Sequence, residues 1–320
     1  MPLFHIHGLV AGLSSPLASG GAVIFTPKTA SFLRDAVTHG ATWYTGTPTL
    51  HRLAAQMPMK EKPGFRFVRS CSSRLEGGLA KQLGERYGCP VVEAYAMTEA
   101  AHQVCSNPVD AAGTREGSVG KPTRVNLKIL DDGGSEVAVG EIGEVCIKGE
   151  NVMAGYMDNE EANAKSFTSR GFFRTGDQGK VMEDGFVVLT GRIKELVNKG
   201  GEKISPVEID NVINQHPDVE EGVAFAMPDE MYGEDVGAAV ILKSGADLGE
   251  KELKAYVGER LLQAKVPKKV FFVTEIPKTP VGKMQRGLVA KTMLGESDEC
   301  ERSGAGDPVW SDLRHYTSCI

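Results

Sequence analysis

The sequence lacks the signatures of membrane, secreted and zinc-binding proteins. No apolar run approaches the roughly 20 residues that a membrane-spanning helix needs. The N-terminus reaches His5 and His7 without the basic start of a signal peptide. The six cysteines form no C-x-x-C pair, which disfavours a zinc site. Cysteines scattered in this way are typical of an intracellular protein with reduced thiols.

Positive charge and a C-terminal targeting signal are also missing. Lys and Arg number 36 against 42 Asp and Glu, and the net charge of −6 disfavours binding to nucleic acid or to anionic membranes. The last residues, SCI at 318–320, differ from the peroxisomal signal S-K-L. We therefore expect a cytoplasmic protein, with a peroxisomal location as the alternative. Nothing in the sequence indicates the oligomeric state.

What is present is an ordinary globular composition, with 41% hydrophobic and 24% charged residues in a chain long enough for two domains. Strands alternate with helices up to residue 95, which predicts a parallel α/β sheet. Ser31 is a candidate N-cap, and Gly40 would follow the end of the same helix. The strands are expected at 21–25, 41–45, 67–70 and 91–95, and the helices at 31–39 and 78–87.

The pattern changes after Pro122. Residues 125–130 and 143–148 alternate between polar and apolar, and 181–189 predict a hairpin around Asp184-Gly185. This indicates an antiparallel, barrel-like subdomain. A compact α+β unit is expected from about Gly191 onward, with helices and strands at 206–214, 219–227, 236–242, 250–261 and 269–273. The polar residues 294–320 lack periodicity and predict a disordered tail.

The segment EAYAMTE at 93–99 places a hydroxyl beside a carboxylate just past a strand. Open α/β sheets bind ligands at the carboxyl ends of their strands. Thr98 can donate to a phosphate oxygen, and the Glu99 carboxylate can hold Mg²⁺. The alternative is that the two side chains cap a helix.

Asp177 ends the motif FRTGD in a turn flanked by glycine, where a carboxylate can accept from both hydroxyls of a ribose. Arg192 adds a planar, permanently charged fork for hydroxyl or phosphate oxygens. The alternative for Asp177 is a role in forming the turn.

Two loops further along carry lysines. Gly200-Gly201 permits close approach of the backbone to a ligand, with Lys199 and Lys203 as neighbouring cations. Lys283 follows Gly282 and supplies a point charge suited to a carboxylate that is being transferred. The alternatives are a charged loop before a helix and a solvated lysine.

Taken in order, these segments resemble the adenylate-forming superfamily of acyl-CoA synthetases, luciferases and peptide-synthetase adenylation domains. The resemblance covers residues 1–293, and the segments PLFHIHGL and EAYAMTEAAHQVCSNP are most similar to the oxalate–CoA ligase branch. The matching segments are PLFHIHG at 2–8, YAMTE at 95–99, the region of Gly155-Tyr156, FFRTGD with GRIKELVNKGGEKISP, and PKTPVGK at 277–283.

The resemblance implies an α/β fold with a partial large domain over residues 1–190, a hinge at 191–194 and a small C-terminal α+β domain over 195–293. The large domain would combine the parallel sheet with the barrel-like subdomain. ATP, Mg²⁺ and coenzyme A would be the cofactors, and a small carboxylic acid, with oxalate favoured, would be activated as its acyl-adenylate and passed to CoA. Another thiol acceptor, or a remnant that binds nucleotide without catalysis, remains as an alternative.

Roles for single residues follow from the same resemblance. Catalysis would rest on Lys283 beside the carboxylate and α-phosphate, on Thr98 at the phosphates and on Glu99 at Mg²⁺. The nucleotide and CoA would be held by Tyr95 near the adenine, Asp177 and Arg192 at the ribose, the hinge residue Lys194, and Gly200, Gly201 and Lys203 along the pantetheine path. The acid would contact His5, His7, Ser72 and His102, because a small dicarboxylate needs polar partners rather than an apolar tunnel.

The sequence departs from the family pattern in two places. The Thr/Ser/Gly-rich loop ending in P-K-G is absent, and the chain opens at the segment that follows this loop in relatives. We therefore expect an N-terminally truncated ligase with little or no adenylating activity. The loop on the adenine side, at residues 70–76, carries the large, charged Arg74 where relatives have small residues.

Overall fold

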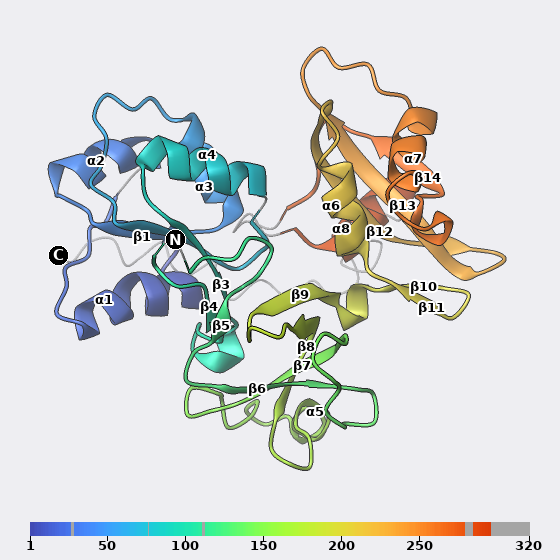
Figure 1. Ribbon diagram of the computed structural model, residues 1–320, viewed down its shortest axis with the longest axis horizontal. Helices are drawn as coiled ribbons and strands as arrows, with labels where there is room; N and C mark the ends of the chain where they lie inside the picture. The colour runs from blue at the N-terminus through green and yellow to red at the C-terminus, as the bar shows by residue number, and fades with distance from the viewer. Residues whose placement is uncertain (27–28, 76, 111–112, 279–283, 296–320) are drawn as a thin grey trace, which may run out of the picture.

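The computed structural model describes residues 1–26, 29–75, 77–110, 113–278 and 284–295. In these residues the chain builds three sheets, which Figure 1 shows from the blue N-terminal part to the orange C-terminal part. We call the first two sheets with their helices the large lobe and the third sheet with its helices the small lobe. The chain passes from one to the other through η4 (Ile193–Glu195).

The first sheet is parallel where strands alternate with helices along the sequence, as predicted. Its strands pair in chain order, the first three parallel and the last two antiparallel. They are β1 (Trp43–Gly46), β2 (Phe67–Ser70), β3 (Val91–Tyr95), β4 (Cys105–Ser106) and β5 (Lys121–Pro122).

Helices lie on both faces of this sheet, with α2, α3 and α4 on one face and α1 on the other (Figure 1). The Thr47 side chain caps α3 by accepting from the Leu50 N–H at 3.4 Å, and Pro48 occupies the first turn. Val68, Leu83 and Tyr87 are fully buried in the core under α4. The helical segments are η1 (His7–Ser14), α1 (Ser15–Ala18), η2 (Thr29–Ser31), α2 (Phe32–Thr38), α3 (Pro48–Gln56), α4 (Gly77–Tyr87) and η3 (Thr98–Ala100).

The strand predicted at residues 21–25 does not form. These residues have no regular structure, and Phe25 is 62% exposed. Their apolar run resembles a buried strand, but no described strand pairs with it, so its backbone has no ladder to join. Ser31, predicted to cap α2, instead donates its hydroxyl to Asp35 Oδ2 at 2.6 Å.

The second sheet is antiparallel, in the order β6-β7-β8-β9. One apolar cluster joins it to the first sheet, since Tyr95 and Val104 pack with Val145, Ile147 and Phe173. Its two outer strands do not pair with each other in the described residues, so the predicted barrel-like part is an open sheet. Its elements are β6 (Asn126–Leu130), β7 (Gly143–Lys148), α5 (Glu160–Ser166), β8 (Phe173–Val181) and β9 (Val187–Arg192).

The small lobe is built on a third sheet in the order β11-β10-β13-β12, with β14 beside β13. The alternation of side chains along a strand gives this sheet two apolar faces. Val223 and Phe225 face the cluster that includes Val289 of α8, whereas Ala224 faces the cluster with α6 and α7. The elements are β10 (Val197–Lys199), β11 (Glu202–Ile204), α6 (Pro206–Ile213), β12 (Val219–Asp229), β13 (Gly233–Leu242), α7 (Glu250–Gly258), η5 (Gln263–Lys265), β14 (Lys269–Phe272) and α8 (Arg286–Leu294).

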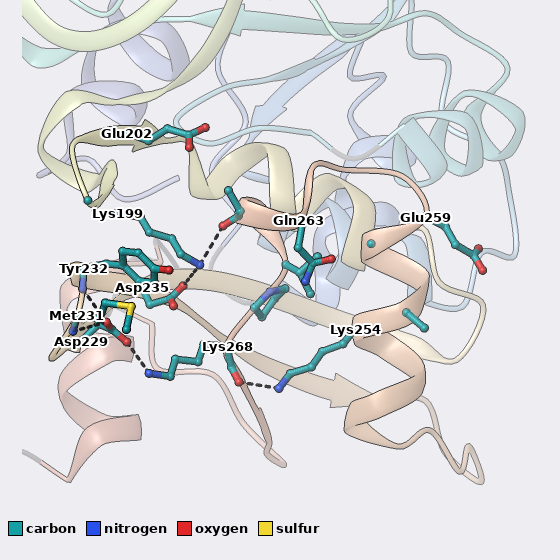
Figure 2. A pocket seen from close by; sticks show the side chains of 16 residues that line it. Lys199, Glu202, Asp229, Met231, Tyr232, Asp235, Lys254, Glu259, Gln263 and Lys268 are labelled. Carbon is teal, nitrogen blue, oxygen red and sulfur yellow. Dashed lines mark hydrogen bonds and ion pairs between the residues drawn. The ribbon is translucent and has the colours of Figure 1, made fainter.

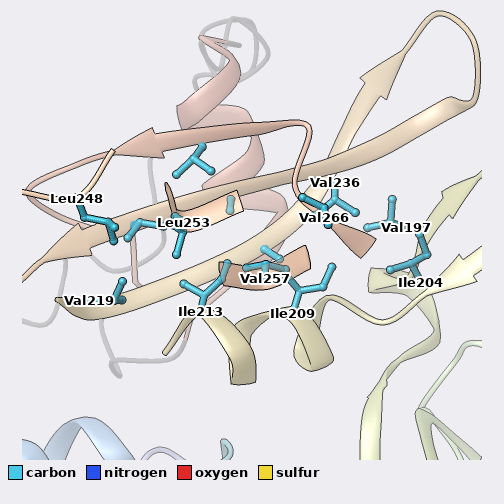
Figure 3. Packing of buried hydrophobic residues seen from close by; sticks show 14 residues of the cluster. Val197, Ile204, Ile209, Ile213, Val219, Val236, Leu248, Leu253, Val257 and Val266 are labelled. Carbon is cyan, nitrogen blue, oxygen red and sulfur yellow. The ribbon is translucent and has the colours of Figure 1, made fainter. Parts of the chain in front are cut away.

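Figure 3 shows the larger of these clusters, in which Ile209 and Ile213 of α6 and Val257 of α7 point toward one layer under the long strands. Helix α7 ends at Gly258, three residues before the predicted end, and α8 was not expected from the sequence. No helix of the described chain is both long and apolar enough to span a membrane. The predicted tail lies outside the described residues from 296 onward.

Candidate active site

Polar side chains gather where the three parallel strands end. Thr45 lies near the end of β1, Ser72 follows β2, and Thr98 follows β3. Parallel strands bring their carboxyl ends to one edge of a sheet, which is where open α/β sheets bind ligands. The segment 95–104, which starts at the last residue of β3, carries Tyr95, Thr98, Glu99 and His102, so one short stretch of chain supplies four of these polar side chains.

The four residues predicted to contact the acid do lie together. His7 Nδ1 is 3.1 Å from Ser72 Oγ, and the His7 ring stacks on His102 with centroids 4.4 Å apart. The His7 backbone N–H donates to His5 Nδ1 at 3.1 Å. His7 Nε2 lies 2.6 Å from the hydroxyl of Thr45, a partner that the sequence did not identify. These side chains form the His7 cluster.

Both stacked histidines are held neutral. Burial, followed by the charges of His102 and Arg69, lowers the pKa of His7 to about 2. Burial, followed by the charge of Arg69, lowers the pKa of His102 to about 3. The ring nitrogens of His102 are buried and have no hydrogen-bond partner among the described residues. A neutral imidazole offers one donor and one acceptor, so His102 has both to offer a ligand.

The backbone is strained at this cluster. Ser72, Ala101 and His102 have φ of 78°, 47° and 60°, in the left-handed region that favours glycine. Residues other than glycine hold such conformations only when their surroundings enforce them, and they gather at functional sites. The strain therefore supports a binding role for the segment.

Sequence reasoning missed Arg69, which contacts Thr45 of the cluster, and Gln103, which contacts Arg69. Arg69 Nη1 donates to Thr45 Oγ1 at 3.3 Å, and its Nη2 donates to Gln103 Oε1 at 3.4 Å. The sequence did carry a signal, because a charged residue inside the predicted buried strand at 67–70 is unusual.

A second group of side chains comes together beside the first sheet. The Tyr95 hydroxyl donates to Asp177 Oδ2 at 2.5 Å, and Arg192 Nε lies 2.9 Å from Asp177 Oδ1. Asp177 and Arg192 are opposite each other in the β8–β9 ladder, and the Asp177 side chain is 6% exposed. Burial and the Asp177 charge raise the pKa of Tyr95 well above its ordinary value, so Tyr95 stays a donor.

Thr98 and Glu99 lie in η3, directly after the strand that carries Tyr95. Thr98 is exposed, and Glu99 Oε1 accepts from the Tyr156 hydroxyl at 3.0 Å. Tyr156 and Lys194 line the same open cavity of about 790 Å³. The predicted metal ligand thus lies near the point where the chain crosses between the lobes.

The described residues contain no group of three or more His, Cys, Asp or Glu that could hold a metal ion by themselves. Glu99 nevertheless fits a Mg²⁺ ion that also binds phosphate oxygens, because Mg²⁺ usually takes one or two carboxylates and keeps several waters. The donor chemistry at Glu99 is therefore compatible with this ion together with a nucleotide.

Gly200 and Gly201 form the turn of the β10–β11 hairpin, with φ of 58° and 95°. Gly200 lines an open cavity of about 1060 Å³ in the small lobe, shown in Figure 2. At one side of this cavity Lys199 Nζ lies 2.6 Å from Asp235 Oδ1, close to the Tyr232 ring. Lys203 is exposed on β11 and does not line the cavity.

Lys283 lies outside the described residues. The helix that follows it begins at Arg286, which is anchored by Asp210 Oδ2 at 2.6 Å and by Glu195 Oε2 at 3.1 Å. Glu195 directly follows the predicted hinge residue, so the start of α8 and the crossing between the lobes are tied together.

Comparison with known proteins identifies a family that the chain matches. The AMP-binding enzyme family matches residues 1–157, and the C-terminal domain of AMP-binding enzymes matches residues 208–283. An oxalate–CoA ligase of Arabidopsis thaliana is 47% identical over 303 residues, which is 92% of this chain and 59% of the relative. A sulfoacetate–CoA ligase of Cupriavidus necator is 37% identical over 289 residues, which is 89% of this chain and 57% of the relative.

The chain therefore spans less than two thirds of the length of these curated relatives. Among solved structures, ATP-bound MatB from Rhodopseudomonas palustris superposes with a TM-score of 0.85 at 33% identity, over 91% of this chain and 59% of MatB. The apo form of MatB, over the same shares, superposes with a TM-score of 0.73. The two matched regions and the identity to these relatives over most of its length lead to one conclusion: this chain belongs to the family of AMP-binding enzymes.

Proposed function

We propose that this chain carries the site of an ATP-dependent ligase that activates a small carboxylic acid as its acyl-adenylate and transfers it to coenzyme A. The observation that carries the proposal is the segment 95–104. It joins the Tyr95–Asp177 contact to His102 of the His7 cluster, so a nucleotide and an acid would meet along one loop.

The nucleotide half rests on Asp177 and Arg192. Both Asp177 oxygens accept hydrogen bonds in this structure, from Tyr95 and from Arg192, which shows that they face donors. The two hydroxyls of a ribose are donors of the same kind. Thr98, three residues after Tyr95, is exposed and can donate to phosphate oxygens, and Glu99 would hold Mg²⁺ against the same phosphates. Tyr95, fixed by its own hydroxyl, would lie beside the adenine.

The acid half rests on the His7 cluster. His5, His7, Ser72 and His102 offer ring nitrogens and a hydroxyl instead of apolar surface, which suits a small polar acid. Oxalate and sulfoacetate, the acids in the names of the two relatives above, both carry a second anionic group beside the carboxylate that joins CoA. We therefore favour a small acid with two anionic groups, and oxalate first.

The thioester half would use the small lobe. Gly200 and Gly201 would let the CoA pantetheine approach the backbone beside the small-lobe cavity that Gly200 lines. Lys283 would stabilise the carboxylate and α-phosphate in the first step, and rotation about Lys194 would remove it before the second. The better superposition on ATP-bound than on apo MatB supports a lobe arrangement suited to the first step.

Binding of AMP to the chain tests the nucleotide half. Asp177→Asn keeps the shape of the side chain but removes its charge, so AMP should bind roughly 10- to 100-fold more weakly, as expected for loss of charge-assisted hydrogen bonds. Isothermal titration calorimetry gives the dissociation constant. The exposed Asp132 provides the control, because Asp132→Asn makes the same charge change away from the site. Equal affinity of wild type and Asp177→Asn would contradict the assignment.

The acceptor is tested separately. The exposed Lys203 beside the Gly200-Gly201 turn favours CoA, so a preformed acyl-adenylate should react with CoA faster than with a phosphopantetheinyl carrier protein. If the carrier protein is loaded at a comparable or faster rate, the acceptor is another thiol and not CoA. The proposed formation of the acyl-adenylate would be unaffected by that result.

A further inference from the structure

Arg69 holds a positive charge that no carboxylate neutralises in the part of the chain that the structure describes. The residue lies in β2 and is 8% exposed. Its two hydrogen bonds to Thr45 and Gln103 reach neutral oxygens at 3.3 and 3.4 Å, at the long end of the normal range. A guanidinium has five N–H donors, so most of its capacity is unused by these bonds.

Arg286, whose side chain is 12% exposed, shows one way in which this fold pairs a structural arginine. Arg286 is held between the carboxylates of Asp210 and Glu195 at 2.6 and 3.1 Å. A buried charge without such a partner is strongly unfavourable, so its presence at Arg69 calls for an anion that binds there.

The neighbours of Arg69 carry no negative charge, so they cannot supply that anion. They do offer hydrogen-bond donors that could bind one. His7 and His102 are neutral, and the Arg69 charge is one of the reasons. His102 is 2% exposed, and both of its ring nitrogens lack a partner among the residues that the structure describes. Thr45 connects Arg69 to His7, and Gln103, the residue after His102, accepts a hydrogen bond from Arg69. One cation and two uncharged donors thus converge at the carboxyl ends of the strands.

We infer that Arg69 is the specificity-determining residue for the second anionic group of the acid, a carboxylate or a sulfonate. In this arrangement the carboxylate to be activated faces Thr98, and the second anion accepts charge-assisted hydrogen bonds from Arg69 and a hydrogen bond from His102. Acids with one anionic group would leave the Arg69 charge unpaired and bind poorly. The inference rests on the proposed function, because it assumes that the His7 cluster holds the acid.

The test compares oxalate with acetate in calorimetric titrations of the 320-residue chain. Oxalate should bind the wild type at least tenfold more tightly than acetate. Arg69→Gln should weaken oxalate binding by roughly 10- to 100-fold, the range for hydrogen bonds to a charged group, and should leave acetate unchanged. Arg69→Lys should restore part of the oxalate affinity. Arg66→Gln is the matched control, because Arg66 is exposed beside the same strand.

Thermal unfolding without ligand separates a binding role from a structural one. Loss of an unpaired buried charge should leave the Arg69→Gln midpoint unchanged or raise it, whereas loss of a structural arginine would lower it. A lowered midpoint with equal loss of oxalate and acetate binding would overturn the inference. Oxalate affinity in Arg69→Gln within twofold of wild type, or a wild type that binds oxalate no better than acetate, would also overturn it.

Binding of AMP distinguishes failure of this inference from failure of the proposed function. If AMP binds and depends on Asp177 while oxalate is indifferent to Arg69, only the assignment of Arg69 fails. If the wild type binds no AMP, the proposed function fails with it.

Discussion

At the scale of single residues, the site depends on histidines that burial keeps uncharged. His7 is fully buried between Ser72 and Thr45, and His102 stacks on its ring. A protonated His7 would bring a second buried positive charge next to Arg69. Neutral rings can instead donate and accept without repelling that guanidinium, which is why the cluster can contain two histidines and an arginine.

This burial predicts that acid destabilises the fold. The unfolded chain takes up protons at His7 and His102 near pH 6.5, whereas the folded chain does so only near pH 2 to 3. Stability should therefore fall as the pH drops below about 6.5, by up to about 1.4 kcal/mol per pH unit for each histidine. Glu93 acts in the opposite direction, because burial raises its pKa to about 7, so its contribution is largest at low pH and is lost as the pH rises through 7.

Burial also lowers the pKa of His51 to about 4, so three buried histidines against the Glu93 carboxyl leave a net loss of stability on acidification. Urea unfolding between pH 7 and pH 5 measures it, and His7→Gln should flatten the pH dependence. His39→Gln serves as the control, since His39 is exposed at the end of α2. An unchanged slope in His7→Gln would show that the acid sensitivity arises elsewhere.

At the scale of elements, the small lobe illustrates how a strand with two apolar faces organises two layers of helices. The strands β12 and β13 direct alternate residues toward α6 and α7 on one side and toward α8 on the other. Arg286 then fixes the start of α8 to α6 through Asp210 and to the lobe crossing through Glu195. The segment before α8, which carries Lys283, thus ends at a firmly anchored residue.

The packing of α7 predicts a large loss of stability when one of its buried side chains is shortened. Leu253 is completely buried in the cluster of Figure 3, so Leu253→Ala should lower the free energy of unfolding of the small lobe by about 2–5 kcal/mol. Hydrogen exchange of the β13 amides reports on this lobe. The exposed neighbour Lys251 is the control, and Lys251→Ala should change stability by less than about 0.5 kcal/mol. Equal protection in both variants would contradict the packing.

At the scale of the whole molecule, the proposed chemistry requires the small lobe to present a different segment to the large lobe in each of the two steps. The large lobe presents Asp177, Thr98 and the His7 cluster, and the small lobe carries Lys283 in one segment and Gly200 in another. The proposal uses Lys283 in the first step and Gly200 in the second, and a rotation at residues 191–194 would bring each to the large lobe in turn.

This predicts that Lys283→Ala separates the two half-reactions. Pyrophosphate release from ATP and the acid should fall roughly 100-fold or more, since a charge aimed at the transition state is removed. Formation of the CoA thioester from a preformed acyl-adenylate should stay close to wild type. Lys251→Ala should affect neither rate. Equal loss of both half-reactions in Lys283→Ala would count against an exchange of segments.

The sequence by itself determined the order of the elements and the segments that carry chemistry. Alternation of strands and helices predicted the parallel sheet, because each periodicity reflects local geometry and burial of one face. The strands 67–70 and 91–95 match β2 and β3 residue for residue. The resemblance of YAMTE, FFRTGD and the histidine segments identified the family, which the comparisons confirmed. The roles of the single residues stay predictions.

Only the tertiary structure decided which of these segments meet, and with what charge. The apolar run at 21–25 resembled a strand, but a strand needs a neighbour, and pairing is a non-local property. No local pattern could show that Tyr95 and Arg192 converge on Asp177 from different strands. Nor could it show that Arg69 is buried without a carboxylate partner in the described part of the chain, since a missing counter-charge is visible only after distant segments have packed around the guanidinium.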